Sequence, residues 1–187
     1  MRAFVAIPMP EAVLPGLLAL QEPLRAGRPV PEENLHLTLA FLGDTDIPAL
    51  ETLHEELETL AVRPFDLRLA GLDIFGGDQP SVLFIRAQGE GLKELQKSVM
   101  RAIRRAGIEL PRARFAPHVT LARFNRPGPE DLVRIGRYLQ AHGDAALFPF
   151  RVTGFGLYRS DLHRDRAPRA SGRLSLKPAA RPHSLPA

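Results

Sequence analysis

Alternating apolar and polar positions predict most of the strands in this sequence. The segment "NLHLTLAFLG" alternates from Asn34 and ends at Gly43, and "FDLRLAGLDIF" alternates over residues 65–75. Successive side chains of a strand point to opposite faces, so such a segment buries one face and keeps polar groups on the other. Apolar or alternating runs predict further strands over five segments, namely 2–7, 81–87, 114–124, 146–160 and 173–176.

Apolar residues spaced three or four positions apart predict four helices. The second helix is capped by Asp44 and Thr45, and the third ends at Gly107. The expected ranges are 11–26, 47–60, 90–106 and 129–141, and the apolar stripe of the second helix comprises Ile47, Leu50, Leu53, Leu57 and Leu60. Strands and helices in this order predict an α+β fold with largely antiparallel sheets.

The composition fits a protein that folds alone inside the cell. A chain of 187 residues can bury a sufficient core. It contains no cysteine, which excludes disulfides, thiolate nucleophiles and cysteine-bound metals. No apolar run approaches the length of a membrane span, and the N-terminal run ends at Pro8. We therefore expect a cytoplasmic monomer with no membrane contact and no obligate protein partner.

Charge is unevenly distributed along the chain. The formal net charge is +4, but residues 1–90 contain 6 basic and 14 acidic side chains, whereas residues 91–187 contain 19 and 7. Most of the basic side chains are arginines, whose planar guanidinium binds phosphate through two hydrogen bonds. This favours a polyanionic partner. Alternatively, some of these arginines stabilise the fold, because Arg101, Arg104 and Arg105 also suit the C-terminal end of their predicted helix.

Two of the predicted strands contain the same short motif, His-x-Thr followed by an apolar residue. The sequences are "HLTLAF" from His36 and "HVTLAR" from His118. In each, histidine and threonine share one face about 7 Å apart, while the residues between and after them face the core. A single copy is adequately explained as an amphipathic strand. Two copies with apolar residues at both alternate positions indicate a function.

A pair of imidazoles suits acid–base catalysis at neutral pH, because one can accept a proton while the other donates one. Phosphodiester hydrolysis needs both steps: water loses a proton as it attacks, and the leaving ribose oxygen gains one. Two threonine hydroxyls can donate to the non-bridging oxygens. The sequence has no HExxH motif and no clustered carboxylate and histidine set, so we expect neither a metal nor another cofactor.

These motifs, with "ENLHLTLAFLG" and "RFAPHVTLAR" around them, resemble the 2H phosphoesterases. Within that superfamily they resemble the LigT-like RNA 2′,3′-cyclic phosphodiesterases, historically called 2′-5′ RNA ligases. The resemblance runs from residue 2 to about residue 162. It implies a bilobal α+β fold, with two largely antiparallel sheets around a central cleft and helices outside. We expect one such domain over residues 1–177 and a disordered tail over residues 178–187.

The resemblance implies a reaction that opens a 2′,3′-cyclic phosphate, on an RNA end or a small nucleotide, to a 2′-phosphomonoester. Carried onto this chain, it makes His36 the proton donor to O3′ and His118 the proton acceptor from water. The two motifs are alike, so the roles could also be exchanged. Thr38 and Thr120 are expected to hold the phosphate, and Arg123 is a further candidate for contact with it.

Two other readings of the sequence stay open. The same histidines could catalyse reversible 2′-5′ ligation of RNA, or the chain could be a non-catalytic RNA-binding protein that uses its basic C-terminal half. Phe41 is expected in the core rather than as a stacking surface for a base. We assign no chemistry to the four remaining histidines, which are His54, His142, His163 and His183.

Overall fold

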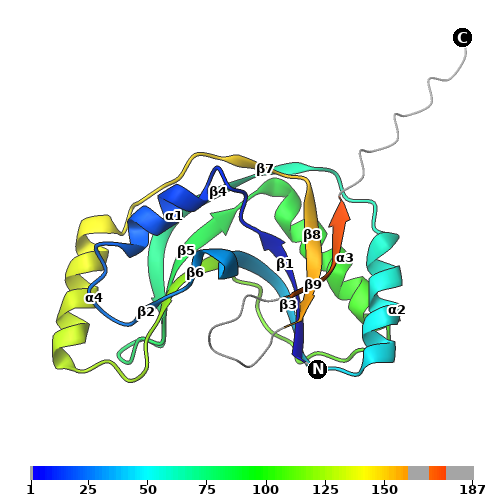
Figure 1. Cartoon of the computed structure of the whole chain (residues 1–187), viewed down its shortest axis with the longest axis horizontal. Coiled ribbons are helices and arrows are strands. Elements are labelled where there is room, and N and C mark those ends of the chain that lie inside the picture. The colour runs from blue at the N-terminus through cyan, green and yellow to red at the C-terminus, as the bar shows by residue number, and fades with distance from the viewer. Residues whose placement is uncertain (1, 160–168, 176–187) are drawn as a thin grey trace, which may run out of the picture.

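A computed structural model of the chain describes residues 2–159 and 169–175 (Figure 1). Within these ranges there are four α-helices and nine strands. The helices are α1 (Leu14–Gln21), α2 (Ile47–Glu58), α3 (Glu90–Arg105) and α4 (Pro129–His142). The strands are β1 (Arg2–Pro8), β2 (Arg28–Pro29), β3 (His36–Asp44), β4 (Phe65–Phe75), β5 (Val82–Gln88), β6 (His118–Arg123), β7 (Phe150–Val152), β8 (Gly154–Arg159) and β9 (Arg169–Ser175).

The strands form one antiparallel path in the order β7-β4-β5-β6-β3-β1-β8-β9, and β2 pairs with β6 beside it. The middle of this path is the contact between β6 and β3, where a single residue pair, Leu37 and Val119, joins them. The two expected sheets are therefore two halves of one continuous sheet, and they meet at β3 and β6, the strands that contain the two motifs. The α+β class with antiparallel strands is confirmed.

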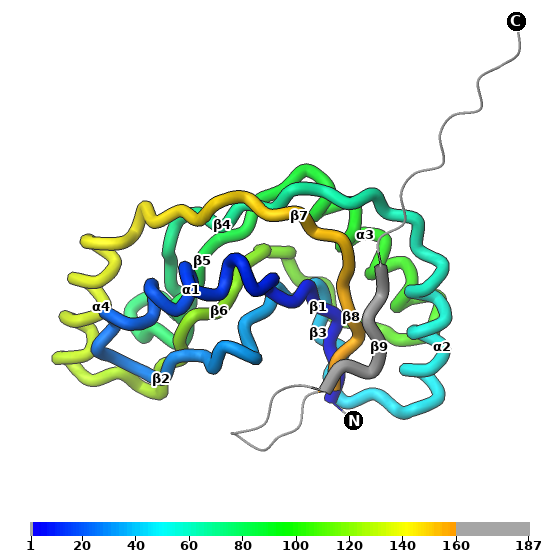
Figure 2. Tube along the Cα trace, turned by 45° about the horizontal axis from the view of Figure 1, so that its top comes forward, coloured from blue at the N-terminus to red at the C-terminus, as the bar shows by residue number. Residues whose placement is uncertain are grey.

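The helices lie in two pairs at opposite ends of the molecule, with β1, β3 and β6 between them (Figures 1 and 2). Helices α1 and α4 are tied together where the Tyr138 hydroxyl donates to the Leu20 carbonyl at 2.5 Å. Helices α2 and α3 pack on each other, and Nε of Arg105 donates to Glu56 at 2.5 Å. Both pairs cover the apolar side of the strands, which leaves the opposite side for polar chemistry.

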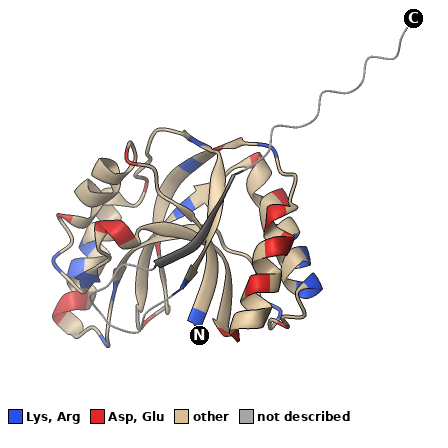
Figure 3. Cartoon of the chain, turned by 45° about the vertical axis from the view of Figure 1, so that its right-hand side comes forward, with Lys and Arg blue, Asp and Glu red and all other residues tan. Residues whose placement is uncertain are grey.

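The uneven charge of the sequence is partly balanced within the fold. Acidic side chains follow α2, and basic ones follow its neighbour α3 (Figure 3). The Arg105–Glu56 ion pair joins them, and Arg151 of β7 likewise pairs with Asp66 of β4 at 3.3 Å. Each of these pairs joins a basic residue of the C-terminal half to an acidic residue of the N-terminal half. A polyanionic partner is thus not needed to explain every arginine of that half.

Several predicted elements have different bounds in the structure. The first helix was expected over 11–26 but covers only Leu14–Gln21. Residues 11–13 form a turn, in which the amide of Val13 donates to the Pro10 carbonyl, and Pro23 has no amide to continue the helix. The stripe of α2 is also shorter, because Ile47 is 56% exposed.

The predicted bounds of the later strands differ more from the structure. The segment 146–160 is not one strand: β7 pairs with β4, whereas β8 turns to pair with β1 and β9. β6 begins at His118 rather than residue 114, and the last strand begins at Arg169 rather than Arg173. The tail expected over residues 178–187 lies outside the described residues.

Candidate active site

Leu37 and Val119 place the two motifs side by side. Both side chains are fully buried, so the residues before and after each of them point to the other face of the sheet. Because β3 and β6 are antiparallel, His36 lies toward Thr120, and Thr38 lies toward His118. His36 and His118 are diagonal neighbours, whose Cα atoms are about 7–8 Å apart on such a pair, and the two threonines occupy the other diagonal. Two imidazoles and two hydroxyls therefore share one face where β3 meets β6.

Both imidazole rings are held in the same way. Nδ1 of His36 donates to the Asn34 carbonyl, and Nδ1 of His118 donates to the Ala116 carbonyl, each at 2.7 Å. A carbonyl oxygen can only accept, so the proton of each neutral ring is on Nδ1. Nε2 of each ring is therefore free to accept a proton when the ring is neutral and to donate one when it is charged.

Aromatic rings pack against His36 from the neighbouring strands. The Phe4 ring of β1 stacks on the imidazole at 4.8 Å between centroids with an interplanar angle of 25°. Tyr158 of β8 stacks on Phe4 in turn, at 5.4 Å. Phe4 is 5% exposed, so the imidazole rests on a buried and well-packed ring. This packing fixes the plane of the His36 imidazole.

His118 has the equivalent support from the other half of the sheet. Phe84 of β5 and Phe75 of β4 both lie 5.0 Å from the imidazole centroid, and they stack on each other at 4.1 Å. β5 borders β6 as β1 borders β3, and β4 and β8 are the next strands outward. Each half of the sheet therefore has the same arrangement, a motif strand with its histidine and two aromatic rings from the next strands that support the imidazole.

Burial lowers the pKa of His36 below its ordinary value of 6.5, although its hydrogen bond to the Asn34 carbonyl opposes this. The positive charges of Arg123 and His118 lower the pKa further. Their influence on His36 indicates that the three groups lie near one another. At neutral pH the free protein therefore has a neutral His36, and a bound phosphate anion would favour its protonation.

A bulge in each motif strand brings one further side chain to this face. In β6, Thr120 pairs with Phe84 and Ala122 with Leu83, so Leu121 is the extra residue. Strict alternation would turn Arg123 away from His118, since five positions separate them. The bulge reverses the phase, so Arg123 lies on the face of the histidines. The predicted proximity of Arg123 to the site has this physical basis.

The same bulge occurs in β3, and it makes one prediction wrong. Thr38 pairs with Ala6 and Ala40 with Val5, so Leu39 is the extra residue. Phe41 then lies opposite Phe4, with ring centroids 6.2 Å apart, and its side chain is 66% exposed. Phe41 is thus an exposed aromatic on the face of the histidines, and not part of the core.

Sequence reasoning missed the supporting residues of the site. Phe4 and Phe84 stand in apolar runs that are typical of any buried strand, so no local signal separates them from core residues. Arg86 pairs with His118 in the strand register and forms an ion pair with Asp73 on β4. Only the strand pairing shows that these residues border the motifs.

The structure also bears on metal ligands, membrane spans and the remaining histidines. Within residues 2–159 and 169–175, no group of three or more His, Asp or Glu side chains is arranged to bind a metal ion. None of the helices in these ranges combines the length and the apolar character of a membrane span. His54 contacts Glu58 at 3.5 Å on α2, and His142 packs against Tyr138. His163 and His183 are outside the described residues.

Comparison with known proteins identifies the family of this chain. The family model of the 2′-5′ RNA ligase superfamily matches residues 16–164. The RNA 2′,3′-cyclic phosphodiesterase of Thermus thermophilus is 34% identical over 178 residues, which cover 87% of this chain and 83% of that protein. Both motifs lie within the range of the family match.

Solved structures show the same fold. TT0787 of Thermus thermophilus superimposes with a TM-score of 0.76 at 29% identity, covering 96% of this chain and 100% of that one. LigT of E. coli in complex with 3′-AMP gives a TM-score of 0.70 at 26% identity, covering 94% and 96%. The matched range, the shared architecture and the paired motifs agree with the resemblance seen in the sequence. This chain therefore belongs to the 2′-5′ RNA ligase superfamily.

Proposed function

We propose that this chain hydrolyses 2′,3′-cyclic phosphates on RNA ends or small nucleotides to 2′-phosphomonoesters. The main support is the diagonal arrangement of His36 and His118 across the Leu37–Val119 pair, with a threonine hydroxyl on either side. The activity named for the Thermus thermophilus relative, and the binding of 3′-AMP by E. coli LigT, agree with a nucleotide phosphate as the substrate.

In the proposed reaction, water attacks phosphorus while Nε2 of neutral His118 takes one of its protons. The bond between phosphorus and O3′ breaks, and Nε2 of protonated His36 gives its proton to O3′. The cyclic phosphate becomes a 2′-phosphomonoester, and the two histidines exchange their protonation states. The negative charge of the bound phosphate favours protonation of His36, which offsets the effect of burial on its pKa.

The threonines and Arg123 have a separate role in this proposal. The hydroxyls of Thr38 and Thr120 donate hydrogen bonds to the non-bridging oxygens, where charge accumulates in the transition state. Arg123 adds a positive charge beside them, and its guanidinium can bind two phosphate oxygens at once. None of these contributions involves a cofactor.

Reversible 2′-5′ ligation remains as a second candidate, supported by the name of the matching family. It would use the same histidines in the same roles, with the 5′-hydroxyl of an RNA attacking phosphorus in place of water and O3′ leaving as before. Hydrolysis is the better-supported activity, because water greatly exceeds any RNA hydroxyl in concentration. The third possibility from the sequence, a non-catalytic RNA-binding protein, predicts no turnover at all.

One assay separates hydrolysis from RNA binding without turnover. The protein is incubated with a 2′,3′-cyclic mononucleotide in EDTA, and the phosphate isomer of the product is identified. Turnover to the 2′-phosphate is expected, with a loss of at least about 100-fold in both His36→Ala and His118→Ala. His54→Ala serves as the matched control and should keep full activity. An inactive wild-type protein that still binds RNA would instead favour the binding function.

The roles of the two histidines can be assigned with a modified substrate. In a cyclic phosphorothiolate whose 3′-oxygen is replaced by sulfur, the leaving thiolate needs little protonation, because thiols are far more acidic than alcohols. If His36 is the acid, His36→Ala should regain most of its activity on this substrate while His118→Ala stays inactive. The reverse pattern would exchange the two roles.

A further inference from the structure

Arg28 and Arg123 lie directly opposite each other on neighbouring strands. In the antiparallel pairing of β2 with β6, Arg28 is the partner of Arg123 and Pro29 is the partner of Ala122. Side chains of a paired position point to the same face, so Arg28 shares the face of Arg123 and of the two histidines. Both arginine residues are exposed. The positive surface beside the histidines therefore extends one strand beyond Arg123.

Specific contacts hold β2 in this position. Gln21 of α1 is buried, and its Nε2 donates to the carbonyls of both Val30 and Leu121 at 2.8 Å. The amide of Val30 also donates to the Leu121 carbonyl at 2.8 Å. Leu121 is the extra residue of the β6 bulge, and its carbonyl is the acceptor that anchors β2. The position of Arg28 is thus coupled to the bulge that orients Arg123.

The turn before Arg28 also requires a particular residue. Gly27 has a positive φ of 71°, and a Cβ there would approach the Phe124 ring to 2.4 Å. Only glycine adopts this conformation without strain and leaves room for the ring. The turn at Gly27 therefore packs over the buried ring of Phe124, the residue that follows Arg123. This contact fixes the position of Arg28 at the start of β2.

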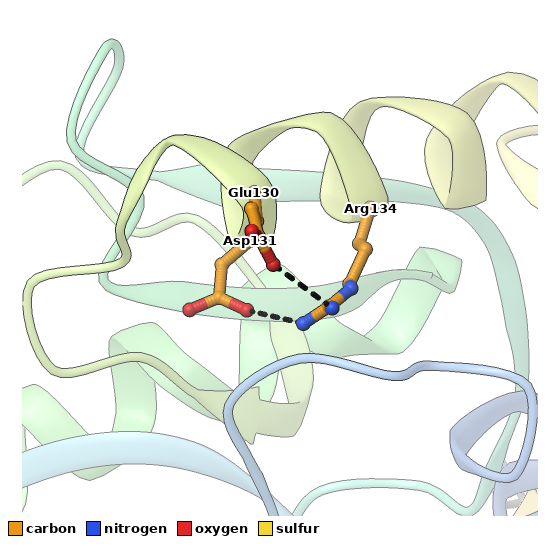
Figure 4. A network of polar contacts seen from close by, with 3 residues as sticks. All are labelled: Glu130, Asp131 and Arg134. Atoms are coloured by element: carbon orange, nitrogen blue, oxygen red, sulfur yellow. Dashed lines mark hydrogen bonds and ion pairs between the residues drawn. The ribbon is translucent and has the colours of Figure 1, made fainter.

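Two like charges at a paired position repel each other unless an anion lies between them. Within the described residues, no acidic side chain forms an ion pair with Arg28 or Arg123. Both arginines border a cavity of about 210 Å³ that is also bounded by Asn125 and Asp131. The Asp131 carboxylate is engaged elsewhere, since it accepts from Arg134 at 3.1 Å (Figure 4). The border of the cavity thus contains two cations and one carboxylate, and that carboxylate is paired with Arg134.

We propose that Arg28 binds a second phosphate of the substrate, the phosphodiester at the 5′ side of the nucleoside that has the cyclic phosphate. This inference rests on the proposed function. Arg123 remains with the cyclic phosphate, because it stands on the same strand as His118 and the bulge places it on the same face. Arg28 shares this face but stands on the neighbouring strand β2, so it is assigned the next phosphate of the RNA chain. The preferred substrate is then an RNA end rather than a free cyclic mononucleotide.

The test compares a 2′,3′-cyclic mononucleotide with a dinucleotide that ends in the same cyclic phosphate. Arg28→Ala should lower kcat/KM for the dinucleotide about tenfold or more, the effect of losing hydrogen bonds between charged groups, and leave the mononucleotide unchanged. Arg104→Ala on α3 removes the same charge from a distant surface and should affect neither substrate. Equal loss on both substrates, or no loss, would overturn the proposal.

A second dinucleotide isolates the charge itself. It has a neutral methylphosphonate at the internal linkage and the same cyclic phosphate at its end. The wild-type protein should lose its preference for this dinucleotide, and Arg28→Ala should cause no further loss. If Arg28→Ala instead weakens both dinucleotides equally, Arg28 does not contact that phosphate.

Binding of the 2′-phosphate products gives a readout that does not depend on turnover. Arg28→Ala should weaken binding of the dinucleotide product about tenfold, and the slope of log affinity against log salt should fall by about one. This arm remains decisive if the protein proves to bind RNA without hydrolysing it. An unchanged affinity and salt slope in Arg28→Ala would refute the second phosphate site independently of the proposed reaction.

Discussion

Phe41 and Arg123 occupy the same position in the two halves of the sheet. Each stands five residues after the histidine of its motif, directly after a bulge, and each is exposed on the face of the histidines. One half thus places an aromatic ring beside the candidate phosphate site, and the other half places a cation there. The repeated backbone provides two equivalent positions, and the side chains give them different chemistry.

An exposed phenylalanine in this position can stack on the base of the substrate. Phe41→Ala should lower kcat/KM for a cyclic mononucleotide about tenfold, within the range measured when stacked aromatic side chains are removed. Phe148→Ala is the matched control, because Phe148 is 92% exposed and lies outside the motif strands. Steady-state kinetics on both variants check the prediction. Equal activity of the two variants would show that Phe41 makes no contact with the base.

The threonine hydroxyls are expected to act in the transition state. Thr38→Val and Thr120→Val should each lower kcat roughly 100-fold, as when a single donor to a developing oxyanion is lost, with a smaller change in KM. Thr38→Ser and Thr120→Ser keep the hydroxyl and should recover most of the activity. Thr52→Val, an exposed position on α2, provides the control. An increase in KM alone would mean that the hydroxyls only bind the ground state.

The aromatic rings behind the histidines are expected to act as positioning residues. Phe4→Leu and Phe84→Leu should each destabilise the protein by about 1–2 kcal/mol, because both rings are buried. They should also lower kcat about tenfold, since the imidazole loses the surface that orients it. Phe155→Leu removes a ring that is 2% exposed and belongs to β8, which does not border a motif strand. It should cost similar stability in urea unfolding and leave kcat unchanged, whereas an equal loss of kcat would point to a general structural effect.

Burial of His36 predicts a dependence of stability on pH. Its pKa in the folded protein is lower than the ordinary value of 6.5, which applies to the unfolded chain. Below pH 6.5 the unfolded chain binds a proton that the folded protein does not. The free energy of unfolding therefore falls as the pH is lowered from 6.5 to the folded-state pKa. Above pH 6.5 the full stability is present. Urea unfolding of wild type and His36→Gln between pH 7.5 and 5 measures the effect.

In the His36→Gln variant this part of the pH dependence should disappear, since glutamine does not titrate. His54→Gln on α2 tests whether any histidine substitution has the same consequence, and it should keep the wild-type slope. If wild type and His36→Gln lose stability in parallel, His36 is not the group responsible.

The sequence alone determined the residues that share a face within each motif strand. Alternation is a local property of extended backbone, so His36 with Thr38, and His118 with Thr120, could be placed above a buried side without knowledge of the fold. The helices α3 and α4 were placed within one residue at each end, because their apolar stripes and terminal residues are also local signals. Local periodicity and turn chemistry account for these successes.

The tertiary structure alone decided which residues complete the site. A bulge depends on the register of the neighbouring strand, so alternation predicts the wrong face for Phe41 and Arg123, five positions after their histidines. Arg28 meets Arg123 only because β2 returns alongside β6, and Phe4 supports His36 from a separate strand. These contacts join positions far apart in the chain and arise from strand pairing and packing. A sequence pattern records the face of a residue along its own strand, but not the neighbours that the fold places beside it.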